Sequence, residues 1–359
     1  MRIIVVAGGT GGHIYPALAI INKIKEKEEN SEVLYIGTSD RMEKDIVPKL
    51  GIRFIGLEMK GLNRKNIFKN VSVMFKTFKS YKKAKTIIKE FNPDIVVGAG
   101  GYVTAPVLYA AHKLGYKTLV HEQNSIPGMS NKFLSSFVDT ICLSFPKSKK
   151  YFKEGKTVFT GNPRSEEINN VSIYSRSELG FKRSSKLVVF VMGSLGSTTI
   201  TNKLKEMIPS FKDKNYQVLI ITGKAYYDSF NDVEIPSNVK LVPFLDNLIN
   251  LMKDTDLLVS RAGASTISEI TAIGLPTILV PSPYVTHNHQ YLNAKDLEDV
   301  GACQIVEEKD FDSDKLIPVI DKIVSDKKLY KSMSDNSFKF GVRDSATRIY
   351  EEIRKLIGE

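Results

Sequence analysis

The stretch RIIVVAGGTGGHIYPALAI, residues 2–20, decides the fold of this chain. Its apolar start over residues 2–7 predicts a buried strand, since strands covered on both faces are nearly continuous in apolar residues. Four glycines follow within five positions, and the segment after them has helical spacing. A strand, a glycine turn and a helix in this order begin a βαβ unit, which predicts an α/β fold built on a parallel sheet.

The same pattern occurs a second time in KLVVFVMGSLGSTTITNKL, residues 186–204. A second pair of segments, residues 93–124 and 255–283, repeats the order of strand, glycine-containing turn, helix and strand. We therefore predict two Rossmann-like domains, whose parallel sheets face each other across a cleft. Their predicted ranges are 1–161 and 162–342, and a C-terminal helix at 343–359 is predicted to pack back on the first domain. Ligands are expected beyond the carboxyl ends of the strands.

Length and composition agree with two soluble domains. The chain has 359 residues, and domains typically have ~100–200. Its two cysteines, Cys142 and Cys303, lie far apart, which favours a reducing compartment over a disulfide framework. The N-terminus does not read as a signal peptide, and no stretch approaches the ~20 apolar residues of a membrane span. The net charge of +11 favours an anionic partner: nucleic acid, a membrane surface or an anionic ligand.

The first glycine turn does not match the known phosphate loops. A GxGxxG reading fails because position 14 is isoleucine, and the turn contains no Gly-Lys-Ser/Thr sequence. These failures disfavour a nicotinamide dehydrogenase and a P-loop NTPase. Turns at residues 8–12, 98–101, 193–196 and 263–265 are each expected at the carboxyl end of a strand, where backbone N–H groups can bind an anion. The alternative is that each is a tight turn without a ligand.

Metal chemistry is disfavoured. His287 and His289 lie in a loop and supply only two ligands, with no third ligand implied. Asp254 and Asp256 resemble the DxD pair with which some sugar transferases hold a metal-bound diphosphate. However, Asp256 precedes a strand and is therefore expected at the edge of the sheet away from the ligands. We interpret the pair as a helix-to-strand turn.

Several segments, taken together and in order, resemble the MurG glycosyltransferases of family 28. They are GGTGGHIYPALAI, GAGGYVTAPVL, HEQNSIPGMSNKFL, TGNPRSEEI, MGSLGS, SRAGASTISEI and NHQYLNA, and they span nearly the whole chain. The resemblance implies the GT-B fold and an inverting transfer with no cofactor and no obligatory metal. It implies transfer of N-acetylglucosamine (GlcNAc) from UDP-GlcNAc to lipid I, the undecaprenyl-pyrophosphoryl-MurNAc-pentapeptide, which gives lipid II for peptidoglycan.

The resemblance also implies roles for individual residues. Glu269 would hold the ribose, Leu245 would contact the uracil through its backbone, and Gln290 would read the sugar hydroxyls. Other residues assigned to UDP-GlcNAc are Thr10, Gly11, Gly12, Asn124, Arg164, Ser194, Ala264, Ser265 and Thr266. Gly100, Gly101 and Tyr102 would face the pyrophosphate of the acceptor. Helix N-termini and Arg164 can stabilise the UDP leaving group electrostatically.

The attacking 4-hydroxyl of the acceptor must lose a proton, and two residues are candidates for the general base. His13 titrates near neutral pH when unperturbed, although it could instead stay protonated and hold a phosphate. Glu122 ends a predicted strand, although it could instead be a structural partner of the loop that follows. We prefer His13.

Residues 60–89 contain ten lysines and arginines and no acidic residue, and their apolar residues have helical spacing. One interpretation is a helix packed on the first domain. The other is a surface that binds anionic lipid, which would place the enzyme peripherally on the cytoplasmic face of the cell membrane. Nucleic acid is disfavoured because no binding motif accompanies the charge. The resemblance also suggests cell-wall and division proteins as partners.

Three alternatives to this function stay open at this point. The chain could be a GT-B enzyme with another acceptor, such as a glycolipid galactosyltransferase. It could be a UDP-GlcNAc 2-epimerase, which shares the two-domain architecture. It could also be a non-catalytic module that binds a nucleotide sugar and scaffolds other proteins.

Overall fold

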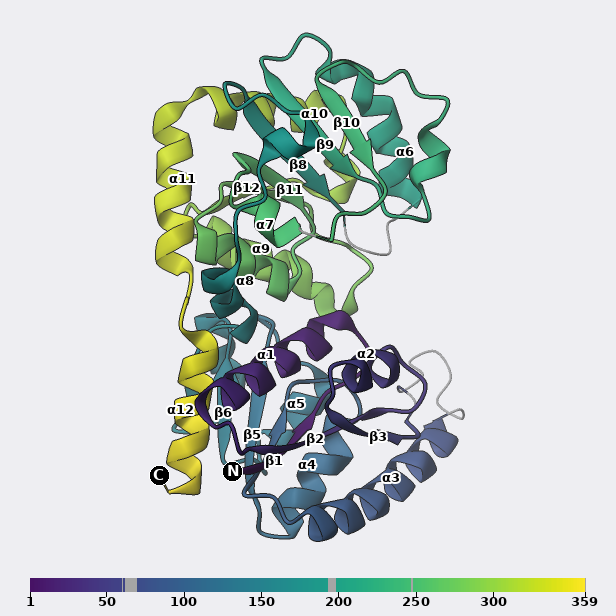
Figure 1. Ribbon diagram of the computed structural model, residues 1–359, viewed down its shortest axis with the longest axis vertical. Coiled ribbons are helices and arrows are strands. Elements are labelled where there is room, and N and C mark those ends of the chain that lie inside the picture. The colour runs from purple at the N-terminus through teal and green to yellow at the C-terminus, as the bar shows by residue number, and fades with distance from the viewer. Residues whose placement is uncertain (60, 62–69, 193–197, 247, 359) are drawn as a thin grey trace. The chain divides into compact units, whose positions relative to one another are not determined.

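The computed structural model describes residues 1–59, 61, 70–192, 198–246 and 248–358. The chain forms two compact units (Figure 1). Unit 1 comprises Met1–Glu166 and Asp344–Glu359, and unit 2 comprises Glu167–Arg343. Each unit contains one sheet, and every strand pair within the two sheets is parallel. The predicted α/β class with two parallel sheets is confirmed.

Unit 1 has a seven-stranded sheet in the order β3-β2-β1-β4-β5-β6-β7. Its strands are β1 (Arg2–Val6), β2 (Glu32–Thr38), β3 (Arg53–Leu57), β4 (Ile95–Gly98), β5 (Lys117–Glu122), β6 (Thr140–Leu143) and β7 (Thr157–Phe159). Its helices are α1 (Gly11–Lys27), α2 (Glu43–Lys49), α3 (Asn70–Phe91), α4 (Thr104–Lys113), α5 (Met129–Leu134) and α12 (Ser345–Ile357). The opening strand β1 lies between β2 and β4, near the middle of the sheet.

Both faces of this sheet are covered, as the near-continuous apolar strands predict. Ile4 and Val6 of β1 pack in a core with residues of α3, α4 and α5. Ile3 and Val5 pack on the opposite face with residues of α1 and α12. Successive side chains of one strand thus supply two separate cores.

Unit 2 repeats the architecture with six strands in the order β10-β9-β8-β11-β12-β13. These are β8 (Lys186–Val191), β9 (Tyr216–Ile221), β10 (Val239–Val242), β11 (Leu257–Ser260), β12 (Thr277–Leu279) and β13 (Cys303–Ile305). Its helices are α6 (Thr198–Met207), α7 (Leu248–Met252), α8 (Ala264–Ile273), α9 (His289–Glu298), α10 (Ser313–Ser325) and α11 (Lys327–Phe340). The core on one face contains residues of α6 and α10.

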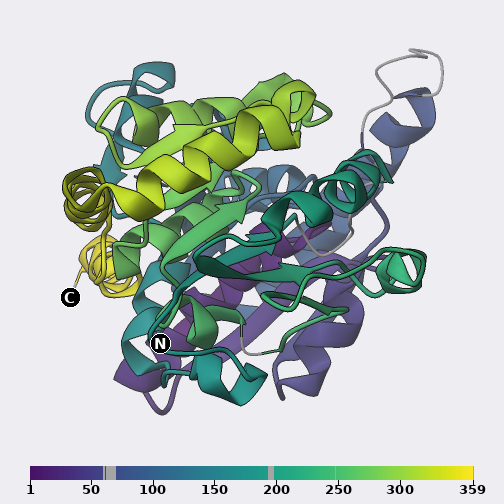
Figure 2. The ribbon, with the colours of Figure 1, turned by 90° about the horizontal axis from the view of Figure 1, so that it is seen from above.

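The last helix, α12, is part of unit 1 and lies beside α1 (Figure 1, and end-on in Figure 2). Ile349 and Ile353 enter the core that β1 and α1 share. The units divide after residue 166, five residues beyond the predicted boundary. The reason is Glu166, whose carboxylate accepts hydrogen bonds from the N–H and hydroxyl of Thr347 at 2.7 Å and pairs with Lys23 at 2.9 Å.

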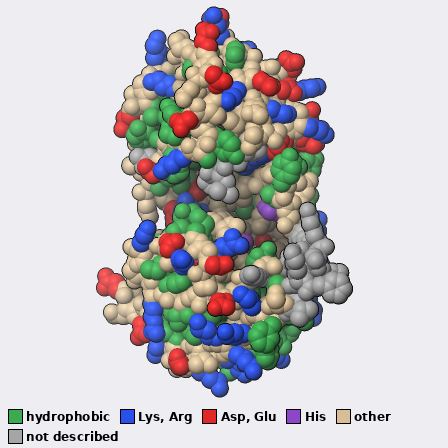
Figure 3. All heavy atoms as spheres, turned by 90° about the vertical axis from the view of Figure 1, so that its right-hand side faces the viewer, with side chains coloured by type: hydrophobic (Ala, Val, Ile, Leu, Met, Phe, Trp, Pro, Cys, Tyr) green, Lys and Arg blue, Asp and Glu red, His purple; other side chains and the backbone are tan. Residues whose placement is uncertain are grey.

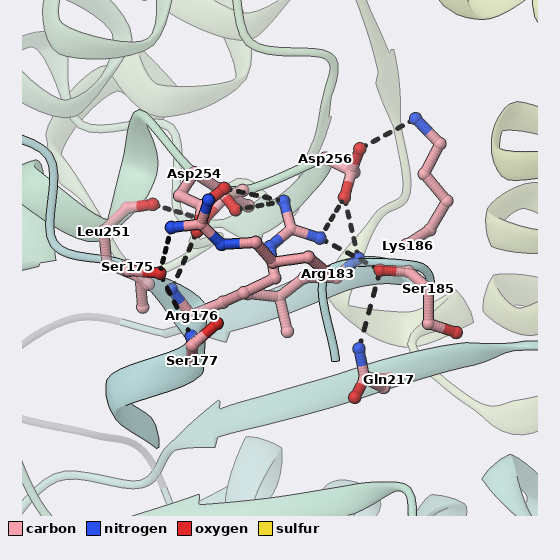
Figure 4. Close-up of polar contacts among 12 residues, drawn as sticks. Ser175, Arg176, Ser177, Arg183, Ser185, Lys186, Gln217, Leu251, Asp254 and Asp256 are labelled. Atoms are coloured by element: carbon pink, nitrogen blue, oxygen red, sulfur yellow. Dashed lines mark hydrogen bonds and ion pairs between the residues drawn. The ribbon is translucent and has the colours of Figure 1, made fainter. Parts of the chain in front are cut away.

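The Asp254–Asp256 pair forms a turn between α7 and β11, as interpreted from the sequence (Figure 4). The Arg176 guanidinium lies 3.1 Å from an oxygen of Asp254 and 2.7 Å from an oxygen of Asp256. Lys186 pairs with the other Asp256 oxygen at 2.7 Å. Hydrogen bonds from these cations and from the Leu187 N–H lower the pKa of Asp256 against the opposing effect of burial. The two carboxylates therefore hold cationic side chains at the amino ends of the strands.

Candidate functional site

The described glycine turns follow the carboxyl ends of strands. Residues 8–12 follow β1, residues 98–101 end β4 and follow it, and residues 263–265 follow β11. Because β1 and β4 are neighbours, the first two turns meet, and the Gly8 N–H donates to the Gly100 carbonyl at 3.3 Å. The turn at 193–196, which includes the predicted donor-binding Ser194, lies outside the described residues.

His13 lies over the junction of the first two turns. Its Nδ1 is 3.1 Å from the Gly8 carbonyl oxygen and 3.4 Å from the Thr10 hydroxyl oxygen. A carbonyl oxygen can only accept, so Nδ1 carries the proton and Nε2 is the basic nitrogen of the neutral ring. The imidazole is half-buried, and its contact with the Gly8 carbonyl favours this tautomer.

Gly100 and Gly101 are required by the position of His13 and of Gly8. Both have positive φ, 98° and 94°, which L-residues with a side chain rarely adopt. A Cβ on Gly100 would lie 2.4 Å from Cδ2 of His13, and one on Gly101 would lie 2.3 Å from the Gly8 oxygen. Both glycines are predicted to face the acceptor pyrophosphate; Gly100 also makes room for the imidazole, and Gly101 makes room for the backbone of Gly8. Tyr102, predicted with them, is exposed.

The helix that follows the first turn offers backbone donors to an anion. Helix α1 begins at Gly11, and Thr10 precedes it with an extended backbone. The carbonyl of Thr10 accepts from the N–H groups of His13 and Ile14. The N–H groups of Gly11 and Gly12 lie before these bonds in the first turn, where helix N–H groups lack intrahelical partners. Thr10, Gly11 and Gly12 therefore lie where the sequence predicts an anion-binding turn.

The N–H of Gly9, by contrast, points into the protein. It donates to Glu43 at 3.2 Å and 3.3 Å from the two carboxylate oxygens. Glu43 is fully buried and also accepts from Thr38. Sequence reasoning missed this residue because a single glutamate in the segment RMEKD resembles a surface charge. Its place at the start of α2, which follows the carboxyl end of β2, is the signal that could have identified it.

Glu122 is buried at the end of β5, and its carboxylate is used within the following loop. It accepts hydrogen bonds from the N–H of Asn124 at 2.9 Å, the N–H of Gly128 at 3.0 Å and the side-chain amide of Asn131 at 2.8 Å. Burial raises its pKa, and these hydrogen bonds partly offset the rise. This geometry favours the alternative interpretation of Glu122 as a structural partner, because its buried oxygens already accept from two N–H groups of the loop and from Asn131 of α5.

The loop after β5 also joins the glycine turns. The side-chain amide of Gln123 donates to the Ala99 carbonyl at 2.7 Å. Asn124, predicted to reach the donor sugar, lies half-buried in the same loop. Arg164, the predicted cation for UDP, lies 5.4 Å above the ring of Tyr15 on α1. The segments after β1, β4 and β5 thus form one connected edge of unit 1.

The predicted donor residues of unit 2 that the structure describes also follow strand carboxyl ends. Ala264, Ser265, Thr266 and Glu269 lie in the first two turns of α8, directly after β11. Leu245 follows β10, and Gln290 follows β12 by way of a loop. The side-chain oxygen of Gln290 accepts from the Ser282 N–H at 2.8 Å. His287 and Asn288, which precede Gln290, have positive φ, 55° and 51°.

The α8 turn is held from behind by side chains that the sequence did not single out. Arg261 donates to the Val280 carbonyl at 3.1 Å and pairs with buried Glu308 at 2.6 Å. Asn293 donates to the Ala262 carbonyl at 3.3 Å. Within the described ranges, no three His, Cys, Asp or Glu side chains come together as a metal site. No described helix is long and apolar enough to cross a bilayer.

Comparison with known proteins identifies the class of protein. Residues 3–143 match the glycosyltransferase family 28 N-terminal domain, and residues 187–349 match the family 28 C-terminal domain. The chain belongs to glycosyltransferase family 28, and the resemblance stated from the sequence motifs is confirmed. It is therefore related to enzymes that transfer hexose units.

Individual relatives narrow this class. The chain is 43% identical, over 99% of its length and all of the relative, to the UDP-N-acetylglucosamine–N-acetylmuramyl-(pentapeptide) pyrophosphoryl-undecaprenol N-acetylglucosamine transferase of Bacillus cytotoxicus. It is 44% identical to the enzyme of that name from Bacillus licheniformis, with 99% of each chain covered. The crystal structure of MurG from Acinetobacter baumannii matches with a TM-score of 0.81, 25% identity and 99% of each chain covered. This match agrees with the predicted GT-B fold.

A UDP-N-acetylglucosamine 2-epimerase from Listeria monocytogenes, described as putative in its structure title, shares the fold alone. The TM-score is 0.75 at 13% identity, with all of this chain and 96% of the other covered. The fold therefore does not separate the transferase from the epimerase alternative, whereas the full-length sequence identity does.

Proposed function

We propose that this protein transfers GlcNAc from UDP-GlcNAc to the 4-hydroxyl of MurNAc in lipid I, giving lipid II and UDP. The observation that carries the proposal is the identity of 43–44% over nearly the whole chain to transferases named for this reaction. In the reaction the acceptor oxygen forms a bond to C1 of GlcNAc, and the bond from C1 to the β-phosphate oxygen breaks. The electron pair of that bond leaves with UDP, and C1 is inverted.

His13 is the general base of this proposal. Its Nδ1–H donates to the Gly8 carbonyl, so that Nε2 takes the proton of the attacking hydroxyl. On the donor side, the N–H groups at the start of α8 and the Arg164 guanidinium stabilise the charge that develops on UDP without an obligatory metal. Glu269, Leu245, Gln290, Asn124, Thr10, Gly11 and Gly12 keep the donor-binding roles that the resemblance implies, and Gly100, Gly101 and Tyr102 the acceptor role.

Turnover with defined substrates tests the proposal. The protein is incubated with UDP-GlcNAc and a lipid I analogue, and released UDP and the disaccharide product are quantified. We expect both products, and only when the acceptor is present. UDP together with N-acetylmannosamine in the absence of acceptor would instead identify an epimerase. Binding of UDP-GlcNAc without turnover would identify a non-catalytic module. Glu269→Ala should raise the KM for UDP-GlcNAc without changing the fold.

We propose further that unit 1 binds anionic lipid at the cytoplasmic face of the membrane through α3 and its neighbours. The described part of the basic stretch forms α3, which buries Ile88 and Phe91 but leaves Phe75 72% exposed and Met74 70% exposed. The packed-helix interpretation therefore accounts for only one side of α3. Figure 3 shows lysine and arginine side chains close to hydrophobic ones on part of this unit's surface.

Aromatic contacts connect the exposed face of α3 to α4 and α5. Ring centroids are 6.5 Å apart for Phe78–Tyr81, 5.7 Å for Tyr81–Tyr109 and 5.8 Å for Tyr109–Phe133. Lysines lie over three of these rings, with Lys82 above Phe78, Lys85 above Tyr81 and Lys113 above Tyr109. An aromatic surface rimmed by lysines suits the headgroup region of an anionic bilayer.

Sedimentation with phosphatidylglycerol vesicles at low salt tests this surface. The variant with Lys76, Lys79, Lys82 and Lys83 changed to Glu should bind at least about tenfold more weakly, since each basic residue near such a surface contributes about 1 kcal/mol. A matched control changes four lysines of unit 2, Lys322, Lys327, Lys328 and Lys339, to Glu. Equal losses in the two variants, or none in the first, would remove α3 from the proposal.

A further inference from the structure

We propose that Glu43 is a positioning residue for His13 and acts through the peptide bond that joins Gly8 to Gly9. The N–H of this peptide unit, on Gly9, donates to the Glu43 carboxylate at 3.2 Å. Its carbonyl, on Gly8, accepts from Nδ1 of His13 at 3.1 Å. Carboxylate, peptide and imidazole thus form one hydrogen-bonded chain. The inference rests on the proposed role of His13 as base and extends it to a residue outside the site that the sequence motifs define.

The fold makes a specific place for the Glu43 side chain. Glu43 is the first residue of α2 and its side chain is fully buried. A Cβ on Gly37 would lie 2.7 Å from Cγ of Glu43, and a Cβ on Gly8 would lie 2.4 Å from its Oε1. Gly37 on β2 and Gly8 in the turn after β1 therefore leave the room that the carboxylate occupies. A surface glutamate with no role would not need this space.

The surroundings of the Glu43 side chain supply hydrogen-bond donors to both of its oxygens. Thr38 donates to Oε1 from its N–H at 2.9 Å and from its hydroxyl at 2.6 Å, and Gly9 supplies the remaining hydrogen bonds. These partners are neutral donors, and none of the lysines, arginines or histidines that the structure describes forms an ion pair with Glu43. Burying a carboxyl group that has only neutral partners is costly for stability, so its presence beside the glycine turn favours a role in function.

These linked hydrogen bonds have an electrostatic effect on His13. A carboxylate that accepts the Gly9 N–H polarises the peptide, and the Gly8 carbonyl becomes a stronger acceptor for Nδ1–H of His13. This stabilises the imidazolium that forms when Nε2 takes a proton, as the carboxylate of a catalytic triad does directly. Other ionisable groups near the chain are Tyr35, whose pKa is raised by burial and by the charge of Glu43, and the Arg164–Tyr15 pair on the outer side of α1.

Titration of His13 by NMR in Glu43→Gln tests the chain of contacts without using activity. The glutamine has the shape of glutamate but no charge, so we expect the pKa of His13 to fall and its Nδ1–H tautomer to become less populated. The matched control is Glu28→Gln, which removes another carboxylate of unit 1 that binds Tyr350 and Arg354 and has no link to His13. An unchanged His13 titration in a folded Glu43→Gln protein, or an equal change in the Glu28→Gln protein, would overturn the proposal.

Kinetic measurements then distinguish a failure of the positioning role of Glu43 from a failure of the proposed role of His13 as base. Glu43→Gln should lower kcat on the order of tenfold with little change in KM, the scale of a lost partner behind a catalytic ligand, and should move the acid limb of the pH profile to lower pH. In a His13→Gln background the same substitution should have no further effect. A multiplicative loss in the double variant contradicts positioning through His13. Full turnover of His13→Gln alone contradicts the proposed base, while the NMR titration still decides whether Glu43 acts on His13.

Discussion

The two units support their ligand-facing turns with opposite chemistry. In unit 1 the turn after β1 is held by a buried carboxylate, Glu43, that accepts only from neutral donors. In unit 2 the segment after β11 is held by the Arg261–Glu308 ion pair and by the amide of Asn293. The difference matches the proposed chemistry. A negative charge behind His13 favours proton uptake, whereas a diphosphate site needs a rigid turn whose own charges are balanced.

The two units should differ most in the unfolding free energy that is lost when the side chain supporting each turn is replaced. Arg261→Met leaves the Glu308 carboxylate buried without its cation, which should cost about 3–5 kcal/mol of unfolding free energy. Glu43→Gln keeps the shape of the side chain and most of its hydrogen bonds, so it should cost about 1–2 kcal/mol. Urea unfolding, followed by hydrogen exchange in each unit, measures both.

A double variant checks the cause of the Arg261 effect. Arg261→Met combined with Glu308→Gln removes the isolated charge and should recover more than half of the lost stability. If the double variant is as unstable as the single one, the ion pair is not what supports the unit 2 turn.

The glycines of the two turns should also differ. Gly101→Ala places a methyl group 2.3 Å from the Gly8 oxygen at a φ of 94°, which should cost about 2–3 kcal/mol and abolish most turnover. Gly263→Ala should change stability by less than about 0.5 kcal/mol, because its φ is −70° and the nearest atom to its Cβ is 3.7 Å away. Thermal unfolding compares the pair, and equal losses would mean that the Gly8–Gly101 contact is not tight in solution.

Acid should affect the two units in different pH ranges. Burial lowers the pKa of His121 in unit 1 to about 4, so the unfolded chain binds its proton first as the pH falls. The stability from neutral His121 is therefore present above about pH 6.5 and is lost as the pH falls towards 4, by about 2 kcal/mol between pH 7 and pH 5. In unit 2, the lowered pKa of Asp256 confines the corresponding loss to more acid solution, below the ordinary aspartate range.

His121→Asn isolates the first effect, because that variant lacks the titrating group. From pH 7 to pH 5, the unfolding free energy of the wild type should fall by about 2 kcal/mol more than that of the variant. Hydrogen exchange in unit 2 should be unaffected over this range. A pH-independent difference would show that His121 is not buried as a neutral ring.

The smallest expected effects concern the two amides that tie each turn to a neighbouring segment. Gln123→Ala removes a 2.7 Å bond to the Ala99 carbonyl, and Asn293→Ala removes a 3.3 Å bond to the Ala262 carbonyl. Each should cost about 1 kcal/mol, and Gln123 slightly more because its bond is shorter. Denaturant midpoints of the two variants measure both losses. A larger loss of stability in Asn293→Ala than in Gln123→Ala would contradict this prediction.

Much of the fold was predictable because βαβ units carry local signals. The apolar run before Gly8 and the glycines after it predict a strand and a turn, and the repeat at residues 186–204 predicts the second sheet. Of the site, the positions of His13 and the α8 turn at strand ends followed from the same reasoning. The roles of Glu43 and Glu122 did not, because they depend on which way a carboxylate points. Both lie near strand ends, but one supports the first turn and the other a loop.

The return of α12 to unit 1 makes unit 2 an insertion between residues 166 and 344 of unit 1. During synthesis, β1 of unit 1 leaves the ribosome first. Ile349 and Ile353, which belong to the core of the same unit, leave it only after all of unit 2 has emerged. Unit 2 can fold as a continuous segment while one face of the unit 1 sheet still waits for its last helix. A released chain that ends at residue 343 would therefore expose apolar surface on unit 1, whereas unit 2 would hold all of its own core residues.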